Sequence, residues 1–107
     1  MSYYTWVNLQ YSEFAEIQIS ELTDALGKHL DASGIHRDVI KDMTQLFTKQ
    51  ESSFKLYGGM IDEILVWVSA QRPEVPFGVQ GRGEELRDVW VREYKGGQIA
   101  YSQGPFE

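Results

Sequence analysis

The sequence contains no cysteine, two histidines and three prolines. Without cysteine the chain forms no disulfide and offers no thiolate for catalysis or for zinc and iron–sulfur ligation. This composition fits a reducing compartment, and we expect a cytoplasmic protein. No apolar run approaches the roughly 18 residues that cross a bilayer, and residues 1–10 lack the charged and apolar regions of a signal peptide. We therefore predict neither a membrane association nor a cleaved leader.

Recognisable catalytic and cofactor motifs are also missing. The sequence has no GxSxG elbow, no phosphate-binding or dinucleotide-binding glycine pattern, and no metal-ligand spacing. His29 and His36 are separated by the helix breaker Gly34, which is not a ligand spacing, and His29 falls on an apolar helix face where a packed histidine is expected. The sequence predicts no catalytic residue, no metal, no cofactor and no enzymatic activity.

Charge is unevenly distributed. Sixteen acidic against ten basic residues give a net charge of -6, which repels nucleic acid and anionic membranes. We expect no direct nucleic-acid binding; the predicted partner is a basic or nucleic-acid-binding protein. Residues 1–27 contain no lysine or arginine, so Glu21 and Asp24 are assigned to an acidic patch that could receive such a partner, although acidic residues also simply maintain solubility.

Hydrophobic residues at 42% and aromatic residues at 13% of 107 positions predict one folded domain over residues 1–107. Residues 3–10 alternate as a strand, with one face formed by Thr5, Val7 and Leu9 and the other by Tyr4, Trp6 and Asn8. Residues 11–19 fit both strand and helix spacing, and a short strand is favoured. Ser20 is then predicted to cap a helix that ends at Gly34, and its buried stripe is Leu22, Ala25, Leu26, His29 and Leu30.

The middle of the chain alternates between helix and strand patterns. Apolar residues at three- and four-residue spacing predict a helix over about 36–50, and a strand follows over 52–57. The Gly58-Gly59 pair opens a third helix over 60–71, and the prolines at positions 73 and 76 prevent its continuation.

The last stretch, 77–106, predicts three strands. Gly96-Gly97 predicts a tight turn between the second and third strands. We expect the core face to carry Val89, Val91, Ile99 and Tyr101, and the opposite face Trp90, Arg92 and Tyr94. The element order predicts an α+β two-layer sandwich, with an antiparallel or mixed four- to five-stranded sheet and about three helices on one face.

The segment IDEILVWVSAQRPEVPFGVQGRGEELRDVWVREYKGGQ, residues 61–98, resembles phage- and plasmid-encoded ferredoxin-like domains of the Api92-like type. Both run from a helix through a proline-containing turn and a strand into a Gly-Glu-rich loop and an aromatic-bearing hairpin. The resemblance implies a ferredoxin-like variant of the α+β fold and no established activity. In size and acidity the chain is also similar to toxin-immunity proteins and to phage inhibitors of host defence proteins.

The loop over 81–88 is the most highly charged segment. Its partner-contact candidates are Arg82, Glu84, Glu85 and Asp88, joined by Trp90 and Tyr94 on the predicted outer face. These residue types predict a non-enzymatic inhibitor that occludes a basic protein, such as an immunity protein bound to a nuclease toxin. A homodimer through the same face competes with this hypothesis. The alternative function is a small ligand-binding protein or enzyme that uses a pocket lined by the carboxylates of Glu84, Glu85 and Asp88.

Overall fold

The first strand, β1 (Thr5–Ser12), follows the alternation of the sequence. The structure is a computed structural model that describes residues 4–12, 22–84 and 89–104. Thr5 and Val7 are buried, whereas Trp6 and Asn8 are exposed, as the period of two requires. The predicted faces of this strand are confirmed. Of the predicted strand over 11–19, the first two residues belong to β1, and the remainder lies outside the described residues together with Ser20.

Helix α1 (Thr23–Ser33) ends as predicted at Gly34, whose φ of 73° is left-handed. Leu26 and Leu30 are fully buried, but the predicted burial of Ala25 is wrong, because Ala25 is exposed and Gly27 is buried in the same helix. A side chain on Gly27 would meet the guanidinium of Arg37 at 3.0 Å. The absence of a side chain on Gly27 therefore leaves room for the guanidinium of Arg37 against α1.

Two further helices complete the helical layer. Helix α2 (Val39–Lys49) buries Met43, Leu46 and Phe47, and helix α3 (Gly58–Gln71) buries its predicted stripe of Ile61, Ile64, Leu65 and Val68. The spacing of these residues places them along one side of each helix. Both predicted helices are confirmed, with α2 starting three residues later than expected because residues 36–38 form turns.

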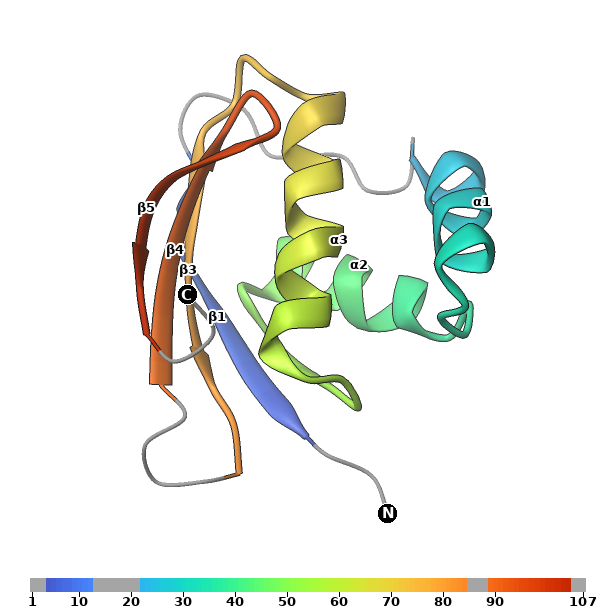
Figure 1. Cartoon of the computed structure of the whole chain (residues 1–107), viewed down its shortest axis with the longest axis horizontal. Coiled ribbons are helices and arrows are strands. Elements are labelled where there is room, and N and C mark those ends of the chain that lie inside the picture. The colour runs from blue at the N-terminus through green and yellow to red at the C-terminus, as the bar shows by residue number, and fades with distance from the viewer. Residues whose placement is uncertain (1–3, 13–21, 85–88, 105–107) are drawn as a thin grey trace.

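The sheet has five strands in the part of the chain that the structure describes, in the order β2-β1-β3-β4-β5. The remaining strands are β2 (Glu51–Phe54), β3 (Phe77–Arg82), β4 (Val89–Lys95) and β5 (Gln98–Gln103). Every neighbouring pair is antiparallel, and Gly96 and Gly97, at φ 61° and 79°, form the predicted turn. The helices lie together on one side of the sheet (Figure 1). The chain is therefore an α+β protein compatible with a two-layer sandwich.

The predicted faces of β4 are reversed. Trp90, Arg92 and Tyr94 are almost completely buried on the helix side, whereas Val89 is 42% exposed. The reason is tertiary: Tyr94 donates a hydrogen bond of 2.6 Å to Asp62 on α3, and the indole of Trp90 occupies the space that a side chain on Gly81 would need.

The predicted burial of Ile99 and Tyr101 is also wrong. All six residues of β5 are exposed, because β5 is an edge strand.

Candidate interaction face of the sheet

One side of the sheet carries no helix within residues 4–12, 22–84 and 89–104 (Figure 1). We call this side the open face. Residues directly opposite each other in neighbouring strands point to the same side of a sheet, so the strand register identifies the members. The open face consists of Glu51, Ser53, Trp6, Asn8, Gln80, Arg82, Val89, Val91, Glu93, Tyr101 and Gln103.

Arg82 and Trp6 form the centre of one row across this face. They are directly opposite each other in β3 and β1, and the guanidinium carbon of Arg82 lies 5.4 Å from the centroid of the Trp6 ring. Trp6 nevertheless keeps 41% of its surface exposed. A large aromatic ring held in place by an arginine and still accessible has the composition of an interface anchor.

The row continues beyond the sheet. Tyr4 stacks on Trp6 with 6.3 Å between the ring centroids, and the ammonium of Lys55 lies 5.8 Å from the centroid of the Tyr4 ring. Two aromatic rings thus lie between two cations, in the order Arg82, Trp6, Tyr4 and Lys55. We call these four residues the aromatic row.

The predicted contact residues divide into three groups. Arg82 and Glu84 are exposed, Arg82 on the open face and Glu84 just after the end of β3. Trp90 and Tyr94 are buried, so their assignment as exposed contact residues is corrected. Glu85, Asp88 and Glu21 lie outside the described residues.

Asp24 is exposed on α1. It belongs to α1 in the helical layer (Figure 1), whereas the strand register places Arg82 on the open face, on the other side of the sheet. The structure therefore does not bring Asp24 together with Arg82.

Trp6 is the aromatic contact that sequence reasoning did not assign. The alternation of β1 separates Trp6 from Thr5 and Val7, and the structure shows that the face of Thr5 and Val7 is the buried one. The sequence predicts Trp90 as a contact residue because it falls on the face opposite Val89 and Val91, whereas its side chain packs across Gly81 towards the core.

Asp62, Arg92 and Tyr94 form a buried polar cluster between α3 and β4. Besides the hydrogen bond from Tyr94, Asp62 has an oxygen 4.0 Å from Nε of Arg92, and a terminal nitrogen of Arg92 donates to the carbonyl of Gln103 at 2.7 Å. Burial, the hydrogen bond to Asp62 and the charge of Asp62 raise the pKa of the Tyr94 phenol far above its usual value. The cluster thus joins α3 to β4 and β5.

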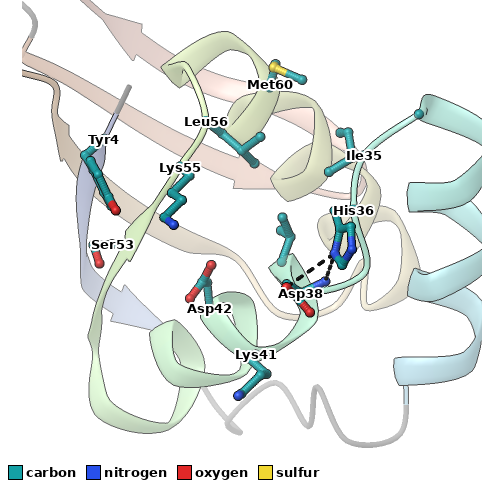
Figure 2. Close-up of a pocket in the computed structure, with 12 residues that line it drawn as sticks. Tyr4, Ile35, His36, Asp38, Lys41, Asp42, Ser53, Lys55, Leu56 and Met60 are labelled. Atoms are coloured by element: carbon teal, nitrogen blue, oxygen red, sulfur yellow. Dashed lines mark hydrogen bonds and ion pairs between the residues drawn. The ribbon is translucent and has the colours of Figure 1, made fainter. Parts of the chain in front are cut away.

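A pocket of about 610 Å³ opens at the β2 edge of the sheet, between the start of α2 and the start of α3 (Figure 2). Its lining residues come from four separate parts of the sequence: Tyr4, Gly34, Ile35, His36, Asp38, Val39, Lys41, Asp42, Ser53, Lys55, Leu56 and Met60. No sequence motif identifies this pocket, because its residues come together only in the fold.

Two lining residues of the pocket, His36 and Asp38, contact each other through the imidazole of His36. The backbone N–H of Asp38 donates to Nδ1 of His36 at 3.1 Å, and the same nitrogen lies 3.4 Å from the Asp38 carboxylate. Asp42 is half-buried, and loss of solvation, followed by the charge of Asp38, raises the pKa of its carboxyl group.

Of the three carboxylates of the alternative enzymatic hypothesis, the structure describes Glu84, which is not among the residues that line this pocket; Glu85 and Asp88 lie outside the described residues. His29 stacks on Trp67 with 5.2 Å between ring centroids, as expected of a packed histidine. Among the described residues, no three histidine, aspartate or glutamate side chains gather closely enough to hold a metal ion. No helix in the same part of the chain is long and apolar enough to span a membrane.

The chain matches no protein-family model, no curated protein and no solved structure in the three comparisons made. The resemblance to Api92-like domains therefore stays a prediction.

Proposed function

We propose that the protein is a non-enzymatic binding module that docks a basic partner protein on the open face and thereby occludes it. The observation that carries this proposal is Trp6, which is exposed on the open face and oriented by Arg82. Tryptophan and arginine dominate the energetics of protein interfaces because they combine large contact area with directed polar contacts. Trp6 and Arg82 are the proposed anchors.

Pre-orientation of the anchors supports the proposal. Trp6 contacts both the guanidinium of Arg82 and the ring of Tyr4, so its ring loses little rotational freedom when a partner packs against it. A side chain that is already ordered in the free protein reduces the entropic cost of association.

The charge of the chain favours a basic partner. The net charge of -6 attracts positively charged proteins over distances of about a Debye length, roughly 8 Å at physiological salt. Glu51 and Glu93 contribute carboxylates to the open face, and Glu84 stands exposed just beyond it. Occlusion of a basic surface is the mechanism by which an immunity protein would neutralise a nuclease toxin, or a phage inhibitor would block a host defence protein. Both settings are cytoplasmic.

A second copy of the chain is the competing occupant of the open face. Light scattering separates the two cases, because self-association through this face predicts a dimer that Trp6→Ala dissociates. A monomeric wild-type protein at working concentration excludes it.

Affinity capture from an extract of the organism that encodes the chain tests the proposal. Wild-type protein, Trp6→Ala and Tyr57→Ala serve as baits, with Tyr57 chosen because it is an exposed aromatic residue outside the open face. We expect a basic protein that is enriched by the wild type and by Tyr57→Ala and is lost with Trp6→Ala. Recovery of the same proteins by all three baits would contradict the proposal.

A further inference from the structure

The carboxylate of Asp42 lies in the pocket, where the charges of Lys41 and Lys55 act on it only from beyond ion-pair distance. Its side chain makes no hydrogen bond and no ion pair with any residue that the structure describes, although it is half-buried. Burial and the neighbouring charge of Asp38 both disfavour the ionised form. A cation placed between these two carboxylates would remove the repulsion and replace the lost solvation.

The start of α2, which borders the pocket, does not offer an anion the free backbone N–H groups of an ordinary helix start. The first backbone N–H groups are already used: Asp38 donates to His36 Nδ1, Val39 to the carbonyl of His36, and Ile40 and Lys41 to the carbonyls of Arg37 and Asp38. Free N–H groups are what makes a helix start attractive to phosphate. Carboxylates occupy that position here.

The two lysines of the pocket leave room for an incoming cation. Lys41 points away from the other labelled side chains in Figure 2. Lys55 places its ammonium over the ring of Tyr4 and not within ion-pair distance of Asp42. Tyr4 therefore already receives one cation, and Lys55 is the internal competitor of any ligand that approaches Asp42 from the side of Tyr4.

The remaining lining suits an aliphatic stem. Ile35, Val39, Leu56 and Met60 contribute apolar surface to the same pocket. A lysine or arginine side chain combines such a stem with a cationic head, and the planar guanidinium of arginine matches both a carboxylate and an aromatic ring.

The pocket adjoins the open face. Tyr4 lines the pocket and stacks on Trp6, and Ser53 lines the pocket and lies directly opposite Trp6 in the strand register. We propose that the pocket receives a lysine or arginine side chain of the protein that docks on the open face, with Asp42 and Asp38 as the charge partners. The identity of the donor rests on the proposed function, whereas the chemistry of the pocket does not.

Titration of the isolated chain with small probes tests the pocket without a partner. The probes are the Nα-acetyl methylamides of arginine and lysine, with those of norleucine and glutamate as controls, and binding is followed by ¹⁵N–¹H NMR. We expect shifts around the pocket with the two basic probes, with dissociation constants on the order of millimolar. Equal shifts with norleucine or glutamate, or none with either basic probe, would overturn the proposal.

Three variants sharpen the test. Asp42→Asn should weaken binding of the arginine probe about tenfold or more, because truncation leaves the cationic head without its main partner. Asp24→Asn removes the same charge on α1, outside the pocket, and should bind as the wild type does. Lys55→Met should bind more tightly, since the competing ammonium is removed. Unchanged binding by Asp42→Asn, with a spectrum that shows a folded protein, would refute the assignment.

The pH dependence is a further readout. Asp42 faces Asp38, Lys41, Lys55 and His36, of which Asp38 raises its pKa and the two lysines lower it. Protonation of Asp42 removes the charge that the ligand needs, so affinity should fall as the pH drops through the raised pKa.

The probe titration uses the isolated chain and needs no partner protein. Its failure would refute only the proposed pocket, and failure of the affinity capture would refute only the docking of a partner on the open face.

Discussion

The guanidinium of Arg82 lies over the indole of Trp6, two residues that face each other across β3 and β1 with 5.4 Å between the guanidinium carbon and the ring centroid. The pair is exposed, so we expect it to matter little for folding. Trp6→Ala and Arg82→Ala should each change the free energy of unfolding by about 1 kcal/mol or less, with a coupling of about 0.5–1 kcal/mol in a double-mutant cycle. Urea denaturation measures all four proteins. A much larger loss with Trp6→Ala would show that Trp6 serves the core instead.

A substitution at Gly81, in contrast, should lower the free energy of unfolding clearly. An added Cβ at this position would lie 2.1 Å from two ring atoms of Trp90, and both residues are buried. Gly81→Ala should therefore destabilise the protein by about 1–3 kcal/mol or more.

Gly59→Ala is the matched control for Gly81→Ala. A Cβ at Gly59 meets nothing within 4 Å, and alanine favours the helical conformation by about 0.5–1 kcal/mol. This variant should be as stable as the wild type or slightly more stable. Equal denaturation midpoints for the two variants would contradict the packing of Trp90 on Gly81.

Tyr94 predicts a stability loss at alkaline pH. Its phenol has a usual pKa of 10.0, which burial and Asp62 raise in the folded protein. Above about pH 10 the unfolded chain therefore releases a proton that the folded chain retains, and stability should fall by about 1.4 kcal/mol per pH unit from this group. Tyr94→Phe removes this contribution.

At neutral pH the same variant tests the hydrogen bond itself. Tyr94→Phe leaves the Asp62 oxygen without its donor at 2.6 Å, and we expect a loss of about 1.5–3 kcal/mol. Denaturation at pH 7 and above pH 10 separates the two effects. An unchanged slope at alkaline pH in Tyr94→Phe would mean that other tyrosines cause the loss.

Folding raises the pKa of the Asp42 carboxyl group, so this group stabilises the protein at acidic pH and not at neutral pH. Its contribution is fully present below the unfolded pKa, near 3.8, and is lost as the pH rises through the raised folded pKa. Relative to Asp42→Asn, the wild type should thus lose stability between acidic and neutral pH. Urea midpoints across this range give the difference. A wild type that gains stability relative to Asp42→Asn on the way to neutral pH would contradict the environment assigned to Asp42.

The contrast between β1 and β4 shows what the sequence could predict. In β1 the sequence predicts that Thr5 and Val7 share one face and that Trp6 and Asn8 share the other, and the structure confirms this separation. In β4 apolar residues occur in both phases, and Arg92 shares its phase with Trp90 and Tyr94. A charged residue normally marks the outer face, but here Asp62 on α3 lies beside Arg92 within the fold. Which face of β4 is buried therefore depends on Asp62, a residue of α3, and cannot be read from the strand alone.

The pocket was unpredictable for a related reason. Tyr4, Asp42 and Lys55 meet only because β1, α2 and the segment after β2 converge at one edge of the sheet. None of these residues lies in a motif. The predicted contact loop was recognised from its charge density, and of its members the structure describes Arg82 and Glu84 as exposed.

The affinity of the captured basic protein for the wild type and for Trp6→Ala is the most direct measurement of the central claim. Isothermal titration calorimetry with Tyr57→Ala as control should show a loss of about 30-fold or more with Trp6→Ala, as expected when an interface anchor worth roughly 2 kcal/mol is truncated. The control should bind within about twofold of the wild type. Equal affinities for the wild type and a folded Trp6→Ala would contradict the open face as the docking site.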